Sequence, residues 1–185
     1  MPITVPDGQE AVGAVAAELL AADDGAEIAS AILRAIAIAD QPDTLDPDLW
    51  GPAPSRAEFA AAAARSERRI RQARLRVLED SLSRDRAAAV LGVLPQQVSK
   101  LIAARDLLTL EAGRELRLPR WQFDPDTPKG RLEGIREVMH TFGGGVVTLS
   151  LWATRPNPAL GRRTPAQALA DGDVGAVVAA AIAGV

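Results

Sequence analysis

Four polar residues in the middle of the chain, Gln96, Gln97, Ser99 and Lys100, have side chains with which proteins read double-stranded DNA. The amide of Gln can bond an adenine edge through its oxygen and its nitrogen at once, and Ser and Lys can reach bases or phosphates. Apolar residues alternate with them at helical spacing, so we expect these four side chains on the outside of a short helix. This pattern predicts DNA binding.

Residues 83–105, which must hold these side chains in place, have the residue order of two short helices joined by a tight turn. Ser83 can cap the first helix because its hydroxyl oxygen can accept an unpaired backbone N–H. Gly92 suits the left-handed conformation that ends a helix, and Pro95 fits the first position of the next helix. The inner faces are small and apolar: Ala87, Ala88, Val90, Leu91, Val98, Leu101 and Ile102. The pattern is typical of a helix-turn-helix, and the alternative interpretation is a structural helical hairpin.

Two short β-like runs, residues 108–111 and 115–118, follow and flank Gly113. This spacing predicts a β-hairpin with glycine in its turn. A hairpin after a helix-turn-helix forms a wing, whose arginines could meet phosphates or the minor groove. Together, the residues predicted to contact DNA are Ser83, Gln96, Gln97, Ser99, Lys100, Arg105, Arg114 and Arg117.

The charge of the chain is unevenly distributed around this segment. The formal net charge is −3, but residues 1–64 hold 2 basic and 11 acidic side chains, a net of −9. Residues 65–120 hold 13 basic and 7 acidic side chains, a net of +6, and residues 121–185 hold 6 of each. The positive charge thus gathers in and before the predicted helix-turn-helix, which favours contact with phosphates. A solvated, charged helix face is the alternative.

The predicted fold class is mainly α, in three parts. Residues 1–54 are expected to form a helical hairpin, over about 7–22 and 28–39, and a Pro-rich linker. Residues 55–124 are expected to hold a long helix, 55–82, with a Ser55–Glu58 capping box, and then the winged helix-turn-helix. Residues 125–185 are expected to form a small helical domain, with helices over about 131–142 and 146–154, and with Thr164 and Asp173 capping two further ones.

The long helix carries a heptad-like stripe that includes Phe59, Ile70 and Val77, with arginines on its other faces. The stripe predicts either a dimer-forming or DNA-flanking helix, or a solvated helix packed within its own subunit. Because one helix-turn-helix makes few base contacts, we expect a homodimer or higher oligomer.

The composition argues against an enzyme. The chain has no cysteine and one histidine, His140, and no local spacing supports a Ser/His/Asp arrangement. We therefore expect no catalytic residue, no cofactor and no metal site. No basic segment precedes an apolar run near the N-terminus, and no apolar run is long enough to span a bilayer, so we expect a cytoplasmic protein that does not contact membranes.

The C-terminal segment has a distinctive order of elements. A Gly-rich turn at 142–144 is followed by Leu151 and Trp152, a Pro-Asn-Pro-Ala-Leu-Gly turn at 156–161, Thr164 before Pro165, and a final apolar helix after Gly172. Over residues 131–185 the chain resembles the toxin-binding domain of the Xre/MbcA/ParS-type antitoxin family, in which a helix-turn-helix also precedes this domain. One departure is Arg162, where that family usually has a second glycine.

The resemblance implies an antitoxin of a type II toxin–antitoxin system. Such an antitoxin neutralises a RES-domain toxin, which consumes NAD, and the antitoxin also represses its own operon. It implies that the partner-binding residues are Trp152, Asn157, Leu160, Arg162, Arg163, Val178, Ile182 and Val185. The alternative is a stand-alone transcriptional regulator whose C-terminal domain mediates oligomerisation.

Overall fold

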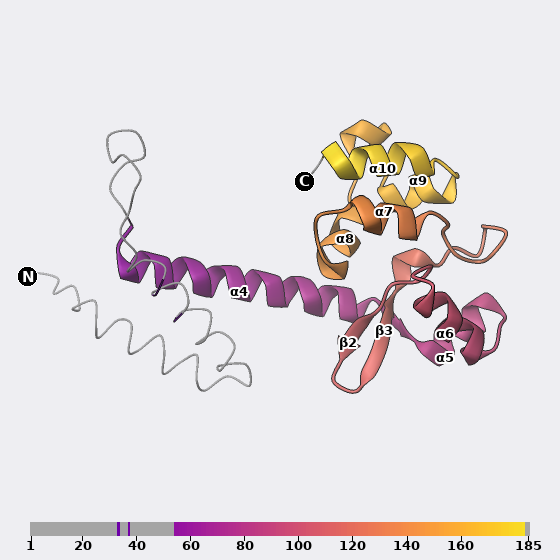
Figure 1. Ribbon diagram of the computed structural model, residues 1–185, viewed down its shortest axis with the longest axis horizontal. Coiled ribbons are helices and arrows are strands. Elements are labelled where there is room, and N and C mark those ends of the chain that lie inside the picture. Colours follow the sequence, from indigo (N-terminus) through magenta and orange to yellow (C-terminus); the bar gives the residue numbers. More distant parts are fainter. Residues whose placement is uncertain (1–32, 34–36, 38–53, 184–185) are drawn as a thin grey trace, which may run out of the picture. The chain divides into compact units, whose positions relative to one another are not determined.

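The computed structural model describes residues 33, 37 and 54–183 (Figure 1). Within these ranges the protein is mainly helical, with a small three-stranded antiparallel sheet. The chain divides into two compact units, residues 1–71 and 72–185. The structure does not describe the helix expected over 7–22. Of the helix expected over 28–39 it describes only residues 33 and 37, and of the Pro-rich linker only residue 54.

Helix α4, Arg56–Glu79, begins at the predicted capping box. The Ser55 amide donates to Glu58 Oε2 at 2.8 Å, and the Glu58 amide donates to Ser55 Oγ at 3.3 Å. The Ser55 amide and, at 2.8 Å, the Ser55 hydroxyl both donate to Glu58 Oε2, which favours the charged carboxylate and lowers the pKa of Glu58. Of the predicted stripe, Ile70 is 57% exposed, whereas Val77 is buried within the chain.

The predicted end of this helix at residue 82 is wrong, because residues 81–83 form strand β1, Ser81–Ser83. Strands β2, Leu110–Ala112, and β3, Glu115–Pro119, form the predicted hairpin, with Gly113 at a φ of +60° in its turn. All neighbours are antiparallel in the order β1-β3-β2, and Leu82 faces Leu118 in the register. Strand β2 starts two residues later than predicted, because Leu107 and Leu108 are buried in the core instead.

Helices α5, Arg84–Leu91, and α6, Pro95–Ala103, form the predicted helix pair. Ser83 caps α5 by accepting the Arg86 amide, and Gly92 ends it in the left-handed conformation with φ +64°. Pro95 is the first residue of α6, as predicted. A core cluster joins the two helices to the sheet: Ala87, Ala88, Val98, Leu107 and Leu118. Ala87 and Val98 are fully buried, so neither position has room for a larger side chain.

A short 3-10 helix, η1, Arg120–Gln122, follows the sheet and contains the buried amide of Gln122. Gln122 Oε1 accepts the Leu108 amide at 2.5 Å, and Gln122 Nε2 donates to the carbonyls of Leu108 and Pro119 at 3.0 and 3.1 Å. The side chain thus satisfies backbone groups that water cannot reach. Leu107 enters the helix-pair core, and its neighbour Leu108 enters the C-terminal core.

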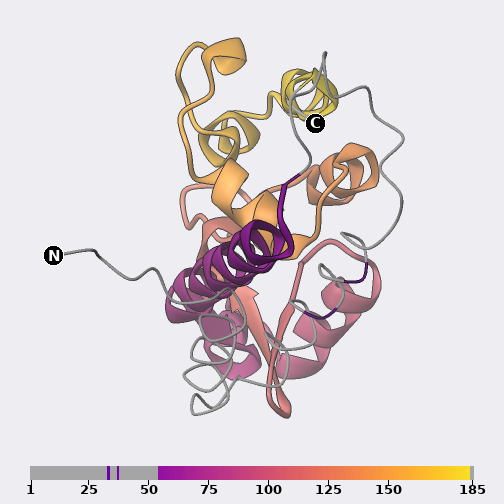
Figure 2. The same cartoon turned by 90° about the vertical axis from the view of Figure 1, so that its left-hand side faces the viewer.

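The C-terminal helices gather on the opposite side from the β2–β3 hairpin (Figures 1 and 2). Their bounds are α7 Ile135–Thr141, α8 Val146–Ala153, η2 Pro158–Leu160, α9 Pro165–Ala170 and α10 Val174–Ala183. The helix expected from residue 131 starts only at 135, because Arg131 forms a β-bridge with Phe123 and Gly134 has a φ of +82°. Thr164 caps α9 as predicted, and Pro165 is its first residue.

One apolar core holds these helices together, and it includes Leu132, Ile135, Leu149 and Val177. Trp121 packs against the same core, and its indole N–H donates to Ser150 Oγ at 3.0 Å. The C-terminal helices therefore share packing with the end of the sheet. Among the helices of the described ranges, none has the length and apolar character needed to cross a membrane.

Candidate nucleic-acid interface

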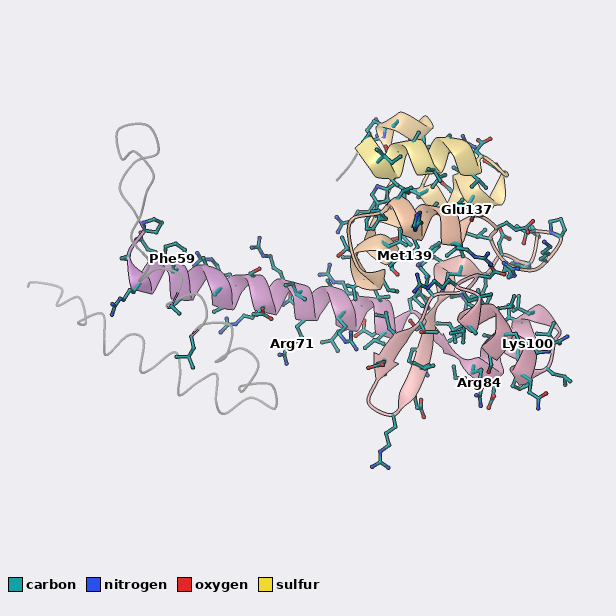
Figure 3. All side chains as sticks on the ribbon, in the orientation of Figure 1. Phe59, Arg71, Arg84, Lys100, Glu137 and Met139 are labelled. Atoms are coloured by element: carbon teal, nitrogen blue, oxygen red, sulfur yellow. The ribbon has the colours of Figure 1, made fainter. Side chains whose placement is uncertain are left out.

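Helix α6 presents one polar face to solvent. Val98 on its inner side is fully buried, whereas four residues on the opposite side are exposed: Gln96, Ser99, Lys100 and Ala103. We call these four the outward face of α6. Figure 3 shows Lys100 on α6 and Arg84 at the start of α5, both on the outside of the helix pair. The outward face thus includes three of the four residues with which the sequence prediction began, and the fourth, Gln97, is exposed as well, so all four lie on the outside as predicted.

Gln97, the fourth, has a structural role that the sequence prediction missed. Its Oε1 accepts the backbone N–H of Leu94 at 3.0 Å, which satisfies an amide that the first turn of α6 leaves unpaired. This bond occupies one of the two lone pairs of the Gln97 amide oxygen and holds the side chain against the backbone of Leu94, which disfavours a two-bond contact with adenine. The missed signal is a glutamine three residues after the N-cap position.

The other outward side chains differ in whether they already make hydrogen bonds within the protein. The Ser99 hydroxyl donates to the Pro95 carbonyl at 3.2 Å, so its oxygen remains free only as an acceptor. Gln96 and Lys100 make no side-chain hydrogen bond or ion pair within the described part of the chain. Of the two glutamines of this helix, Gln96 is therefore the one whose side-chain amide makes no hydrogen bond within the described part of the chain.

A groove of about 550 Å³ runs between α6, the start of α5 and the β2–β3 hairpin. Its lining includes Ser83, Arg84, Asp85, Ser99, Ile102, Ala103, Arg114, Glu115 and Leu116. Two basic and two acidic side chains line it, so the groove itself has no net charge. The basic surplus lies largely on α4, whose sequence holds seven arginines and three glutamates.

The other predicted DNA-contacting residues divide into exposed and engaged ones. Arg105 and Arg114 are exposed, and Arg105 has a left-handed φ of +59°. Arg117 is half-buried and donates to the Ser81 carbonyl at 2.7 Å, which holds β1 to β3 and gives this side chain a structural role. Ser83 accepts the Arg86 amide at 3.3 Å and acts as the helix cap.

Of the predicted partner-binding residues, Leu160 is buried, and Trp152 and Asn157 are half-buried. Leu160 is 3% exposed and belongs to the core, and Trp152 packs on that core with its ring centroid 5.4 Å from that of Phe142. Asn157 accepts the Ala159 amide at 2.9 Å and caps η2. These three residues shape the turn before α9 from within.

Arg162 and Arg163 follow this turn and differ in their contacts. Arg162 is exposed with a left-handed φ of +67°, which explains why glycine suits this position. Arg163 donates to Asp171 at 2.5 Å and to Asp173 at 2.6 Å, and these hydrogen bonds raise its pKa above the ordinary value. Arg163 therefore closes the α9–α10 connection and has both carboxylates as partners.

Helix α10 contains no polar side chain. Val178 packs against the core, whereas Ile182 is 61% exposed. Val185 lies outside the described residues.

Comparisons of the chain with models of protein families, with curated proteins and with solved structures find no match. Within the described ranges, no group of three or more His, Cys, Asp or Glu side chains is placed to hold a metal ion.

Proposed function

We propose that this protein is a DNA-binding antitoxin, which recognises an operator through the outward face of α6 and neutralises a RES-domain toxin through its C-terminal helices. The observation that supports DNA binding is the polar outward face of α6 beside a groove that the β2–β3 hairpin flanks. This arrangement supports a winged helix-turn-helix, whose second helix would enter the major groove.

The charge of α4 supports the sequence-independent part of binding. Its arginines outnumber its glutamates by seven to three, and basic side chains near phosphates release counterions from the duplex. Affinity for any duplex should therefore fall as the salt concentration rises. We expect the DNA-binding form to be a homodimer, to which the exposed Ile70 of α4 contributes.

The test of DNA binding uses fluorescence anisotropy with duplexes selected from a random pool. Lys100→Ala and Arg114→Ala should weaken binding to all duplexes and make the salt dependence shallower by about one unit of slope for each lost phosphate contact. Glu111→Ala, on the same hairpin as Arg114, is the matched control and should leave the slope unchanged. Unchanged affinity in Lys100→Ala and Arg114→Ala would place the DNA-binding surface elsewhere.

The toxin-binding part rests on the family resemblance of residues 131–185. Co-expression with a RES-domain toxin tests it, with cellular NAD and growth as readouts. Ile182→Asp changes the exposed part of α10 and should abolish protection, whereas Glu137→Ala on the exposed side of α7 should preserve it. Full protection by Ile182→Asp would show that α10 does not cover the toxin.

A stand-alone regulator is the second candidate. It is favoured by the internal contacts of Leu160 and Arg163, because side chains that are buried or paired within the chain are less available to a toxin. A protein that binds one duplex specifically but does not bind a RES-domain toxin would support this candidate.

A further inference from the structure

The side chains at the N-terminal end of α6 differ in which hydrogen-bonding groups they have available for a base edge. The amide of Gln96 makes no hydrogen bond within the described part of the chain, so its donor and its acceptor can turn together towards a base. The Gln97 oxygen already accepts the Leu94 amide, and this bond fixes the orientation of the Gln97 side chain. Ser99 offers only an acceptor, because its hydroxyl proton goes to Pro95.

Only one major-groove base edge matches both groups of Gln96. Adenine presents the N7 acceptor beside the N6 donor, whereas guanine presents two acceptors. The free glutamine can therefore make two bonds with adenine and would leave its oxygen unpaired on guanine. Gln97 is oriented by its bond to the Leu94 amide, so turning it towards a base in the same way would weaken or break that bond.

Leu94 adds an apolar group next to this polar one. It is 67% exposed, the most exposed large apolar side chain among residues 54–183, and it immediately precedes the first turn of α6. Covering a side chain of this size is favourable, because it removes apolar surface from water. The major-groove side of an A·T pair presents the thymine methyl group together with the adenine edge, so the same kind of base pair suits Leu94 and Gln96.

We propose that this end of α6 recognises adjacent A·T pairs, with Gln96 bonding adenine N6 and N7 and Leu94 contacting a thymine methyl group, while Gln97 holds the helix end. This assignment rests on the proposed DNA-binding function and adds to it which base pair is read. It separates two neighbouring glutamines that have identical side chains into a base-reading residue and a positioning residue.

The first experiment selects 30-base-pair duplexes with a randomised centre against the full chain and its variants. The wild type should enrich a motif with A·T pairs, Gln96→Ala should lose the preference at one of them, and Leu94→Ala should lose the preference at a neighbour. Gln97→Ala should keep both preferences, although its α6 is less stable than in the wild type. Gln97→Glu retains an acceptor at the same place, so it should keep both preferences with a helix more stable than that of Gln97→Ala. Gln167→Ala removes the same kind of cap from α9 and controls for a general loss of stability.

The second experiment alters single atoms of the selected duplex. Replacing the read adenine by 7-deazaadenine should weaken binding of the wild type about fivefold or more and leave Gln96→Ala unaffected. Replacing the read thymine by deoxyuridine, which lacks the methyl group, should weaken the wild type and leave Leu94→Ala unaffected.

The outcomes separate this assignment from the proposed function. If the wild type enriches no sequence, both fail together. If it enriches a motif but Gln96→Ala keeps every A·T preference, or if Gln97→Glu loses one, DNA binding stands and the assignment of the two glutamines is wrong.

Discussion

The amide of Gln122 offers a sharp test of how the core is held together. Its side chain is fully buried and makes three hydrogen bonds, two of them to the N–H and C=O of Leu108. Gln122→Leu preserves the approximate volume of the side chain but removes all of these bonds. Leu108 is 6% exposed, so water cannot readily replace the amide.

The expected loss follows from the three backbone groups that would lose their partner: the N–H and C=O of Leu108 and the C=O of Pro119. Each buried, unpaired polar group costs about 1–3 kcal/mol, so the free energy of unfolding should fall by about 3–9 kcal/mol. A typical domain is stable by only about 5–15 kcal/mol, so the variant should unfold at much lower denaturant concentration.

The matched control is Gln96→Leu, the same chemical change at an exposed glutamine without hydrogen bonds in the described part of the chain. It should change stability by no more than about 0.5 kcal/mol. Urea unfolding followed by tryptophan fluorescence measures both variants, because Trp121 lies beside Gln122 in the chain.

Amide hydrogen exchange supplies a local readout. The Leu108 amide should be protected in the wild type and should exchange faster in Gln122→Leu than the global loss of stability explains. A Gln122→Leu protein within 1 kcal/mol of the wild type, or with unchanged exchange at Leu108, would refute this account of the buried amide.

Three further predictions concern helix ends and backbone conformation. Gln97→Ala and Gln167→Ala each remove one bond to an N-cap amide. Each variant should lower the free energy of unfolding, measured in urea titrations, by about 0.5–1.5 kcal/mol. An unchanged free energy of unfolding in both variants would argue against the caps. Arg162→Gly should raise the free energy of unfolding by about 1 kcal/mol, because a residue with a side chain is strained in the left-handed conformation. Calorimetry should show a higher Tm, and a lower Tm would contradict this prediction. The pKa of Glu58 is below its ordinary value, so its stabilising effect on α4 is complete above the unfolded-state pKa near 4.5 and is lost as pH falls through the lower folded-state pKa. Ser55→Ala removes the hydroxyl bond and keeps the backbone N–H, so carboxyl NMR titration should show this pKa rising part of the way towards the ordinary value. An unchanged pKa would exclude the Ser55 hydroxyl as a cause and leave the backbone N–H.

The candidate site was predicted in part. The sequence located the outward residues of α6 and the glycine turn of the hairpin, because the apolar spacing of a helix and the conformation of glycine depend on neighbours in the chain. The separate roles of Gln96 and Gln97 were not predicted, because the periodic pattern only places both outside. Arg117 was assigned to DNA from its charge, whereas its bond to Ser81 joins residues 36 positions apart.

The sequence by itself determined the local boundaries of this protein: Ser83, Gly92, Pro95 and Thr164 start or end helices where predicted. Helix capping and backbone conformation depend on residues a few positions apart, so they can be predicted from neighbouring residues in the sequence. Only the tertiary structure decided that residues 81–83 form a strand, since that strand needs a partner almost forty residues away in the sequence, in β3. The same reason applies to Gln122, whose hydrogen-bond partner Leu108 is 14 residues distant and becomes a neighbour only when the two cores pack.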